Sequence, residues 1–309
     1  MTDLVQILRT QKDYEGEMQV QKYRDMRSLL KGEHQDLFNR LEKTRDTINN
    51  PYVVINLPAT IARKQSDLMF LKPVEISVEN KKANNRLKQI LNRNGFQHLC
   101  YKQGITSGAL GGCYFRLRWG LLNKYNSRTG SDGKETNNEV IIEALNPEIV
   151  FPEIQNDRMV SCTLKYVESN KKVSYDTGIK TEEYYIEEHY EPGKYMKSTY
   201  LISSSKGGMK TVLIGEPREI KLPFDFLPVI YIPNALDAGF FGASDFEDKL
   251  ELIHEINNTA SRLSSAIRRY TYPILVATED WIRKAKEQGA PVFHVKRPVD
   301  YLKPNGETV

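Results

Sequence analysis

The chain has 309 residues, of which 39% are hydrophobic and 27% charged, a balance typical of a folded but rather polar protein of more than one compact part. No run of about 18 apolar residues occurs and the amino terminus lacks the apolar segment of a secretory signal, so neither a membrane span nor secretion is expected. The net charge of +4 permits contact with nucleic acid but does not require it, because Lys and Arg are scattered along the chain.

The first fifty residues are highly charged. Helices are predicted over residues 4–20 and 23–31, but their apolar stripes are thin, and such helices need a surface to pack on. We therefore interpret residues 1–50 as a charged helical arm at the periphery of the fold.

A helical region with one strand follows. A helix is expected to begin at Pro58, because proline is favoured in the first turn, and Lys72 and Pro73 end it. The alternating sequence VEISVE then predicts a strand. Two further helices are predicted over residues 84–94 and 96–110.

The segment up to about residue 235 is rich in predicted strands. Two glycines at 111 and 112 lead into the alternating strand CYFRLRWG, and residues 139–232 contain further strands separated by turn residues. Residues 191–193 and 206–208 are predicted tips of hairpins. A meander covered by the preceding helices is an α+β fold, and we assign residues 51–235 to one α+β domain.

Residues 236–272 predict one long amphipathic helix. Ser244 with Glu247 three residues later matches the capping-box pattern, and Pro273 prevents smooth continuation. Apolar residues recur at steps of three and four and form one seam, close to a heptad, which comprises Phe246, Leu250, Ile253, Ile256, Ala260, Leu263, Ile267 and Tyr270. The flanking positions carry small polar residues such as Asn257, Ser261 and Ser265. A rod with one apolar seam and small polar flanks suits packing against copies of itself.

Residues 273–309 predict a strand, a short helix and an extended run. The chain ends on a turn-like Pro-Asn-Gly followed by the beginning of a strand. We therefore expect a truncated product or a fragment of a longer protein.

The sequence contains no convincing catalytic, cofactor or metal site. The five histidines lie far apart, and the HExxH, GxSxG and Walker A motifs are all missing. The glycine-rich residues 104–112 follow a helix rather than a strand, so we expect close packing there and not a phosphate cradle. The three cysteines lack CxxC spacing and are expected to be reduced, buried thiols. We expect neither an enzymatic activity nor a cofactor.

Two alternatives stay open. One is a monomeric nucleic-acid-binding module that uses Arg116, Arg118 and the basic residues between Lys284 and Arg297. The other is an enzyme whose site is assembled from dispersed residues.

The order of the segments resembles the portal (head-to-tail connector) protein family of tailed bacteriophages. The resemblance covers about residues 50–280 and rests on KPVEISVE after its helix, on NPEIVFPEI, and on ASDFEDKLELIHEIN with its PILV exit. It implies that residues 1–235 form an outer wing, that residues 236–272 are the first stem helix, and that residues 273–309 enter the clip, within which this chain ends.

The resemblance also implies a function and partners. Such proteins form a ring at one capsid vertex, typically a dodecamer, through which double-stranded DNA is packaged and ejected. The ring docks the terminase large subunit and contacts capsid, scaffold and head-completion proteins, with no membrane partner, and it is assembled in the cytoplasm of the host bacterium. In this reading the seam packs the stem, and Asn257, Ser261 and Ser265 are candidates for contact between subunits. The candidates for lining the channel or forming ion pairs are Arg262, Arg268 and Arg269.

Overall fold

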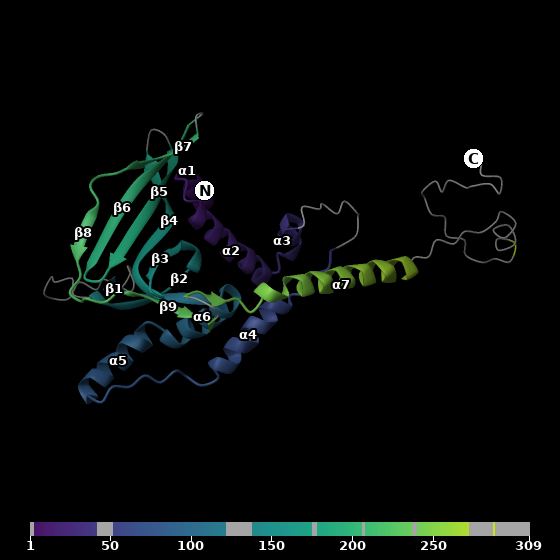
Figure 1. Cartoon of the computed structure of the whole chain (residues 1–309), viewed down its shortest axis with the longest axis horizontal. Coiled ribbons are helices and arrows are strands. Elements are labelled where there is room, and N and C mark those ends of the chain that lie inside the picture. Colours follow the sequence, from purple (N-terminus) through teal and green to yellow (C-terminus); the bar gives the residue numbers. More distant parts are fainter. Residues whose placement is uncertain are drawn as a thin grey trace. The chain divides into compact units, whose positions relative to one another are not determined.

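The structure is a computed structural model of the whole chain, in which residues 3–41, 52–121, 138–174, 178–205, 208–236, 240–271 and 287 are described. It mixes helices with curled sheet, which confirms the α+β prediction at this level (Figure 1). The chain divides into two units, residues 1–261 and residues 262–309. Apart from residue 287, the predicted clip lies outside the described residues, and the predicted domain boundaries stay predictions. No helix in the described ranges is long and apolar enough to cross a membrane.

The amino-terminal helices are α1 (Leu4–Thr10), α2 (Tyr14–Lys31) and α3 (His34–Leu41). The carboxylates of Asp3 and Asp13 cap α1 and α2 by accepting hydrogen bonds from backbone N–H groups in the first turn. Ile7 and Val20 are fully buried and pack with Tyr185 of the large sheet in one apolar cluster. The surface that these thin apolar stripes were expected to need is, for α1 and α2, a sheet far away in the sequence, and the boundaries of the arm stay a prediction.

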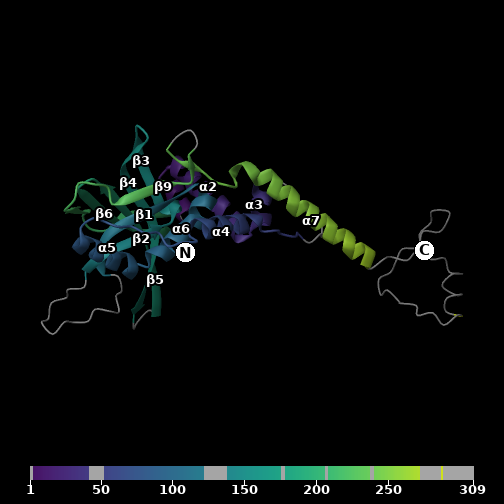
Figure 2. The same cartoon turned by 90° about the horizontal axis from the view of Figure 1, so that it is seen from below.

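The next helices are α4 (Leu57–Met69), α5 (Lys81–Arg93) and α6 (Phe96–Leu110). Proline stands in the first turn of α4 as predicted, and α4 lies beside α6 in both views (Figures 1 and 2). The strand predicted for VEISVE is not formed. Instead, the N–H groups of Val74 and Val78 donate to the side-chain oxygens of Gln97 at 3.0 Å and Asn84 at 3.1 Å, which take the place of a strand partner.

Two main antiparallel sheets follow these helices in unit 1. The smaller has the order β2-β1-β9, with β1 at Gly112–Leu121, β2 at Asn138–Leu145 and β9 at Val229–Pro233. The larger has the order β3-β4-β5-β6-β7, with β8 also paired to β6. Its strands are β3 (Val150–Gln155), β4 (Arg158–Ser174), β5 (Gly178–Glu191), β6 (Lys194–Ser205), β7 (Gly208–Leu213) and β8 (Arg218–Lys221). Both predicted hairpins are confirmed, because Glu191 pairs with Lys194 and Ser205 pairs with Gly208. Short elements complete the order: η2 (Pro147–Ile149), β10 (Ala235–Leu236) and β11 (Gly242–Ala243).

A buried ionic network joins the two sheets. Arg116 of β1 donates to Glu143 of β2 and to Glu188 of β5, each at 2.6 Å, and its side chain is only 15% exposed. Burial by itself raises the pKa of Glu188, but the charge of Arg116 and hydrogen bonds from the hydroxyls of Tyr166 and Tyr190 outweigh it and hold that pKa below the ordinary value. The carboxylate of Glu188 is thus kept ionised between the sheets.

Gly111 occupies the turn from α6 into β1. Its φ is +85°, and a Cβ at this position would lie 2.4 Å from the carbonyl oxygen of Gly242. A side chain would be strained by the backbone angle and would also strike another backbone, so only glycine fits. This confirms the prediction that the glycine-rich segment serves close packing.

Replacing Gly111 with alanine tests that packing. We expect Gly111→Ala to lower the free energy of unfolding by roughly 3 kcal/mol or more, because left-handed strain and a backbone clash add. Gly95→Ala is the matched control, since Gly95 also has a positive φ but nothing lies within 4 Å of its Cβ position. That control should cost about 1 kcal/mol in urea unfolding, and equal losses for both variants would contradict the close approach.

Replacing Glu188 with glutamine tests the ionic network. Because the pKa of Glu188 is lower in the folded chain, its stabilisation is present above the ordinary glutamate pKa of about 4.3 and is lost as pH falls through the folded value. We expect Glu188→Gln to lower the free energy of unfolding by about 2–4 kcal/mol at pH 7 and by progressively less in acid. Urea unfolding of the unmodified chain and of the variant, measured at pH 7 and again at an acidic pH, would show this difference.

Glu219→Gln is the control for that experiment. Glu219 forms a half-exposed pair with Lys194 at 3.6 Å, so its loss should change stability by no more than about 0.5 kcal/mol. A penalty for Glu188→Gln that did not depend on pH would argue for a packing effect rather than a charge effect.

Candidate functional site at the start of the long helix

The long helix begins later than predicted. A 3-10 turn, η3 (Glu247–Lys249), leads into α7 (Leu250–Thr271). Ser244 is not the N-cap of this helix: its buried hydroxyl accepts from the N–H of Phe246 at 3.2 Å and donates to the carbonyl of Ala109 at 2.7 Å. The last carbonyls of a helix lack partners within it. The Ala109 carbonyl of α6 is one of these, and it binds the hydroxyl that the capping-box pattern predicted would cap α7.

The following residue makes a second bond to α6. The N–H of Asp245 donates to the carbonyl of Gly108 at 3.0 Å, and the side-chain amide of Asn234 donates to the Asp245 carboxylate at 2.8 Å. The entry to α7 is thereby fixed to the end of α6 and to the residue after β9.

Apolar contacts hold the first turns of α7. Phe246 and Ile253 are 1% and 7% exposed and lie in one core cluster with residues of α2, α3, α4 and α6. Leu250 packs against the same cluster while half-buried. The first half of the predicted seam therefore packs inside its own chain.

A polar face of α7 meets the extended segment before α4. The side-chain oxygen of Asn257 accepts from the N–H of Ile55 at 2.9 Å, and the hydroxyl of Ser261 accepts from the N–H of Val53 at 2.8 Å. Four helical residues rise about 6 Å and two extended residues advance about 6.6 Å, so the two spacings match. An i, i+4 pair of polar side chains on a helix thus serves as the hydrogen-bonding edge for a strand-like segment.

Asn257 also binds a buried histidine. Its amide nitrogen lies 2.8 Å from Nδ1 of His34, whose Nε2 lies 2.9 Å from the carbonyl of Leu29. A carbonyl only accepts, so Nε2 carries the proton and Nδ1 accepts from Asn257, which defines one neutral tautomer. Asn257 and His34 are both fully buried, and the amide of Asn257 joins α3, α7 and the 52–56 segment.

The predicted assembly residues fall into three groups. Asn257 is fully buried within its own chain, whereas Ile256, Ser261 and Ser265 are half-buried. Leu263 and Ile267, in the last turns of α7, are 60% and 56% exposed. Arg262 and Arg268 are also exposed, and the side chain of Arg269 lies outside the described residues. The roles predicted for these residues between subunits stay predictions, and for Asn257 the structure gives an internal role first.

The basic residues of the nucleic-acid alternative are only partly described. Arg116 is engaged in the buried network, and Arg118 donates to Glu143 at 2.6 Å. Both guanidinium groups therefore already have carboxylate partners within the chain, which makes them less suited to bind phosphates. The stretch from Lys284 to Arg297 lies outside the described residues apart from residue 287.

Chemistry-bearing groups do not converge in the described part of the chain. No group of three or more His, Cys, Asp or Glu residues there could hold a metal ion. The three cysteines are buried, and burial raises the pKa of Cys113 to about 11 and that of Cys162 to about 12. Thiols that stay protonated at neutral pH are poor nucleophiles, so these side chains act in packing.

Sequence reasoning missed the partnership of His34 with Asn257. The two residues are 223 positions apart, and a lone histidine after a helix carries no local signal of a partner. A buried asparagine in the middle of a helix is a weak signal, because asparagine disfavours helix interiors unless its side chain is bound.

Replacing Asn257 with alanine tests this site. The change leaves the N–H of Ile55 and Nδ1 of His34 without their partner, so we expect the free energy of unfolding to fall by about 2–4 kcal/mol. Thr259→Ala on the exposed side of the same helix should stay within about 0.5 kcal/mol in the same denaturant titration. If both variants unfolded at the same denaturant concentration, the internal role of Asn257 would be wrong.

Comparison with known proteins identifies the family. None of the curated proteins compared matches the sequence. The family model described as "Phage portal protein, SPP1 Gp6-like" matches residues 9–307, nearly the whole chain, and confirms the resemblance found in the ordered segments. The chain therefore belongs to the SPP1 Gp6-like family of phage portal proteins.

Proposed function

We propose that this chain is one subunit of a portal ring at a capsid vertex, through which double-stranded DNA enters during packaging and leaves during ejection. The family match over residues 9–307 is the observation that carries the proposal. A phage portal function in general follows from the family, and the ring, a dodecamer by resemblance, is the finer proposal. In the virion this subunit would be a structural component and not an enzyme.

The geometry of α7 supports a role as a stem helix. Its first turns are anchored in a core by Phe246 and Ile253, while Leu263 and Ile267 expose more than half of their surface in the single chain. Large apolar side chains exposed on a helix are favourable when another helix covers them, because burial of a Leu or Ile stabilises by about 1.5–3 kcal/mol. Copies of the same helix in neighbouring subunits are the covering surface that we propose.

A closed ring of identical subunits repeats the same contact between each subunit and the next. Each subunit must present two different surfaces that fit each other, and the contact closes when the rotation per subunit divides a full turn. A channel for moving DNA should also bind phosphate weakly, because each neutralised phosphate adds affinity. Arg262 and Arg268 are exposed near the end of the described helix, where we propose channel lining or ion pairs between subunits.

The partners follow from the same proposal. The ring would dock the terminase large subunit, which would hydrolyse ATP for packaging, and later the head-completion proteins. Capsid and scaffold proteins would surround its outer part. The predicted wing, stem and clip keep the boundaries 1–235, 236–272 and 273–309 as proposals.

The double variant Leu263→Asp with Ile267→Asp tests the stem. Charges at these exposed positions leave the isolated subunit folded but oppose burial between helices, so we expect subunits without rings in negative-stain images. Circular dichroism would check the fold.

Thr259→Asp is the control. It adds a negative charge to the same helix at an exposed polar position outside the apolar seam, so rings should form. Intact rings from the double variant would refute the proposed packing, and failure of the unmodified chain to form rings with a central hole would count against the ring itself.

A further inference from the structure

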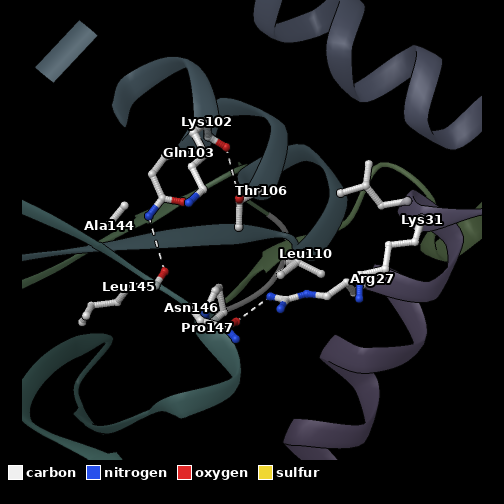
Figure 3. A pocket seen from close by; sticks show the side chains of 11 residues that line it. Arg27, Lys31, Lys102, Gln103, Thr106, Leu110, Ala144, Leu145, Asn146 and Pro147 are labelled. Carbon is white, nitrogen blue, oxygen red and sulfur yellow. Dashed lines mark hydrogen bonds between the residues drawn. The ribbon is translucent and has the colours of Figure 1, made fainter. Parts of the chain in front are cut away.

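A pocket with a basic rim opens between α2, α6 and the end of β2. Its volume is about 290 Å3, and Arg27, Lys31 and Lys102 stand at its rim (Figure 3). Leu30, Leu110 and Pro147 give it an apolar lining. Small-molecule sites usually span roughly 300–1,000 Å3, so this pocket lies at the lower end of that range and is large enough for a large apolar side chain.

Two of the three cations are available. Arg27 donates to Asn146 at 2.5 Å and pairs with Glu148 at 3.1 Å, which fixes it against η2. Lys31 and Lys102 are exposed, and neither ammonium has an ion pair among the residues that the structure describes. The rim therefore carries two uncompensated positive charges beside an apolar lining, which favours an apolar side chain flanked by carboxylates.

The same chain presents such a side chain on α7. Leu252 is 60% exposed, and residues three and four positions away on a helix lie beside it. These neighbours are Asp248, Lys249, Glu255 and Ile256, and Glu251 precedes it directly. The three carboxylates are exposed; Asp248 pairs with Lys249 at 2.6 Å, whereas Glu251 has no ion pair in the described ranges. Leu252 and its three acidic neighbours are here called the acidic knob; Leu252 matches the apolar lining of the pocket, and Glu251 and Glu255 match the charge of its two lysines.

We infer that the acidic knob of one subunit inserts into the basic pocket of the adjacent subunit. The occupant is a second copy of this chain, because both complementary surfaces lie on one chain and carry opposite charge. Leu252 fills the apolar lining, while Glu251 and Glu255 meet Lys31 and Lys102. The inference rests on the proposed ring and gives it a contact: two different surfaces that pair head to tail continue around a ring rather than stopping at a dimer.

Mixed-cysteine crosslinking tests the pairing directly. One preparation of the full chain carries Leu252→Cys and a second, with a different tag, carries Thr106→Cys in the pocket. With a short bifunctional maleimide we expect crosslinks mainly between the two preparations, because the inferred contact brings positions 252 and 106 together. The native cysteines are buried and should add little background reaction. Lys88→Cys on α5 is the control partner. The inference would be overturned if position 252 were crosslinked to position 88 as fast as to position 106. It would also be overturned if position 252 were crosslinked mainly to position 252 of another subunit.

Charge reversal supplies a second measurement. Lys31→Glu with Lys102→Glu, and separately Glu251→Lys with Glu255→Lys, should each weaken self-association by roughly tenfold or more, because like charges would face each other. Mixing the two variants should restore association, which a merely misfolded variant would not do. Lys82→Glu with Lys88→Glu, the same charge change on exposed α5 residues, should have little effect.

The outcomes separate this contact from the proposed function. One outcome is that the variant with Lys31→Glu and Lys102→Glu forms normal rings and that no crosslink joins positions 252 and 106. This outcome would refute the contact but would not affect the proposed portal ring. The absence of rings from the unmodified chain, together with a preferred 252–106 crosslink, would count against the closed ring while supporting the contact.

Discussion

The carbonyl groups at the end of α6 that have no partner within the helix bind two other segments of unit 1. The carbonyl of Gly108 accepts from Asp245, that of Ala109 from Ser244, and that of Gly111 from the N–H of Asn234. One helix end thereby fixes the residue after β9 and the entry to α7, while Gly111 itself turns the chain into β1. Because buried carbonyls are costly to leave unpaired, the position of α7 is tied to the position of α6.

Local patterns predicted the parts of the fold that local chemistry decides. Proline in the first turn of α4, the hairpin at residues 191–193 and the glycine turn at 111 follow from backbone angles, and all three are present. Where a distant group competes, the local pattern is overruled. The Ser244 hydroxyl satisfies a carbonyl 135 positions away, and in VEISVE side-chain amides replace a neighbouring strand. The carbonyl of Ala109 and the amide of Gln97 lie 135 and 23 positions from their partners, beyond the reach of a local pattern.

Periodicity gave the amphipathic character of α7 but not the partner of each face. The small polar side chains Asn257 and Ser261, expected between subunits, bind the chain's own 53–55 segment. Leu263 and Ile267 of the apolar seam are exposed in the single chain. A polar face suits the internal contact because it satisfies N–H groups that no strand pairs, and hydrogen bonds fix the register of the two elements. The two apolar residues keep more than half of their surface exposed, which suits the helix contact between subunits that we propose.

Polar residues of α7 bind within the chain, whereas apolar residues farther along the helix are exposed, and this difference bears on the proposed assembly. Buried hydrogen bonds such as those of Asn257 are specific in geometry and rigid, so the base of α7 is set before any subunit meets another. In the proposed ring, the acidic knob on that base would be presented in a fixed position, and apolar contacts along the helix would add buried area. Electrostatic pairing speeds encounter and rejects wrong registers, whereas apolar burial supplies most of the affinity. A ring built in this order would select its neighbours by charge near the base of α7 and gain its stability farther along the helix.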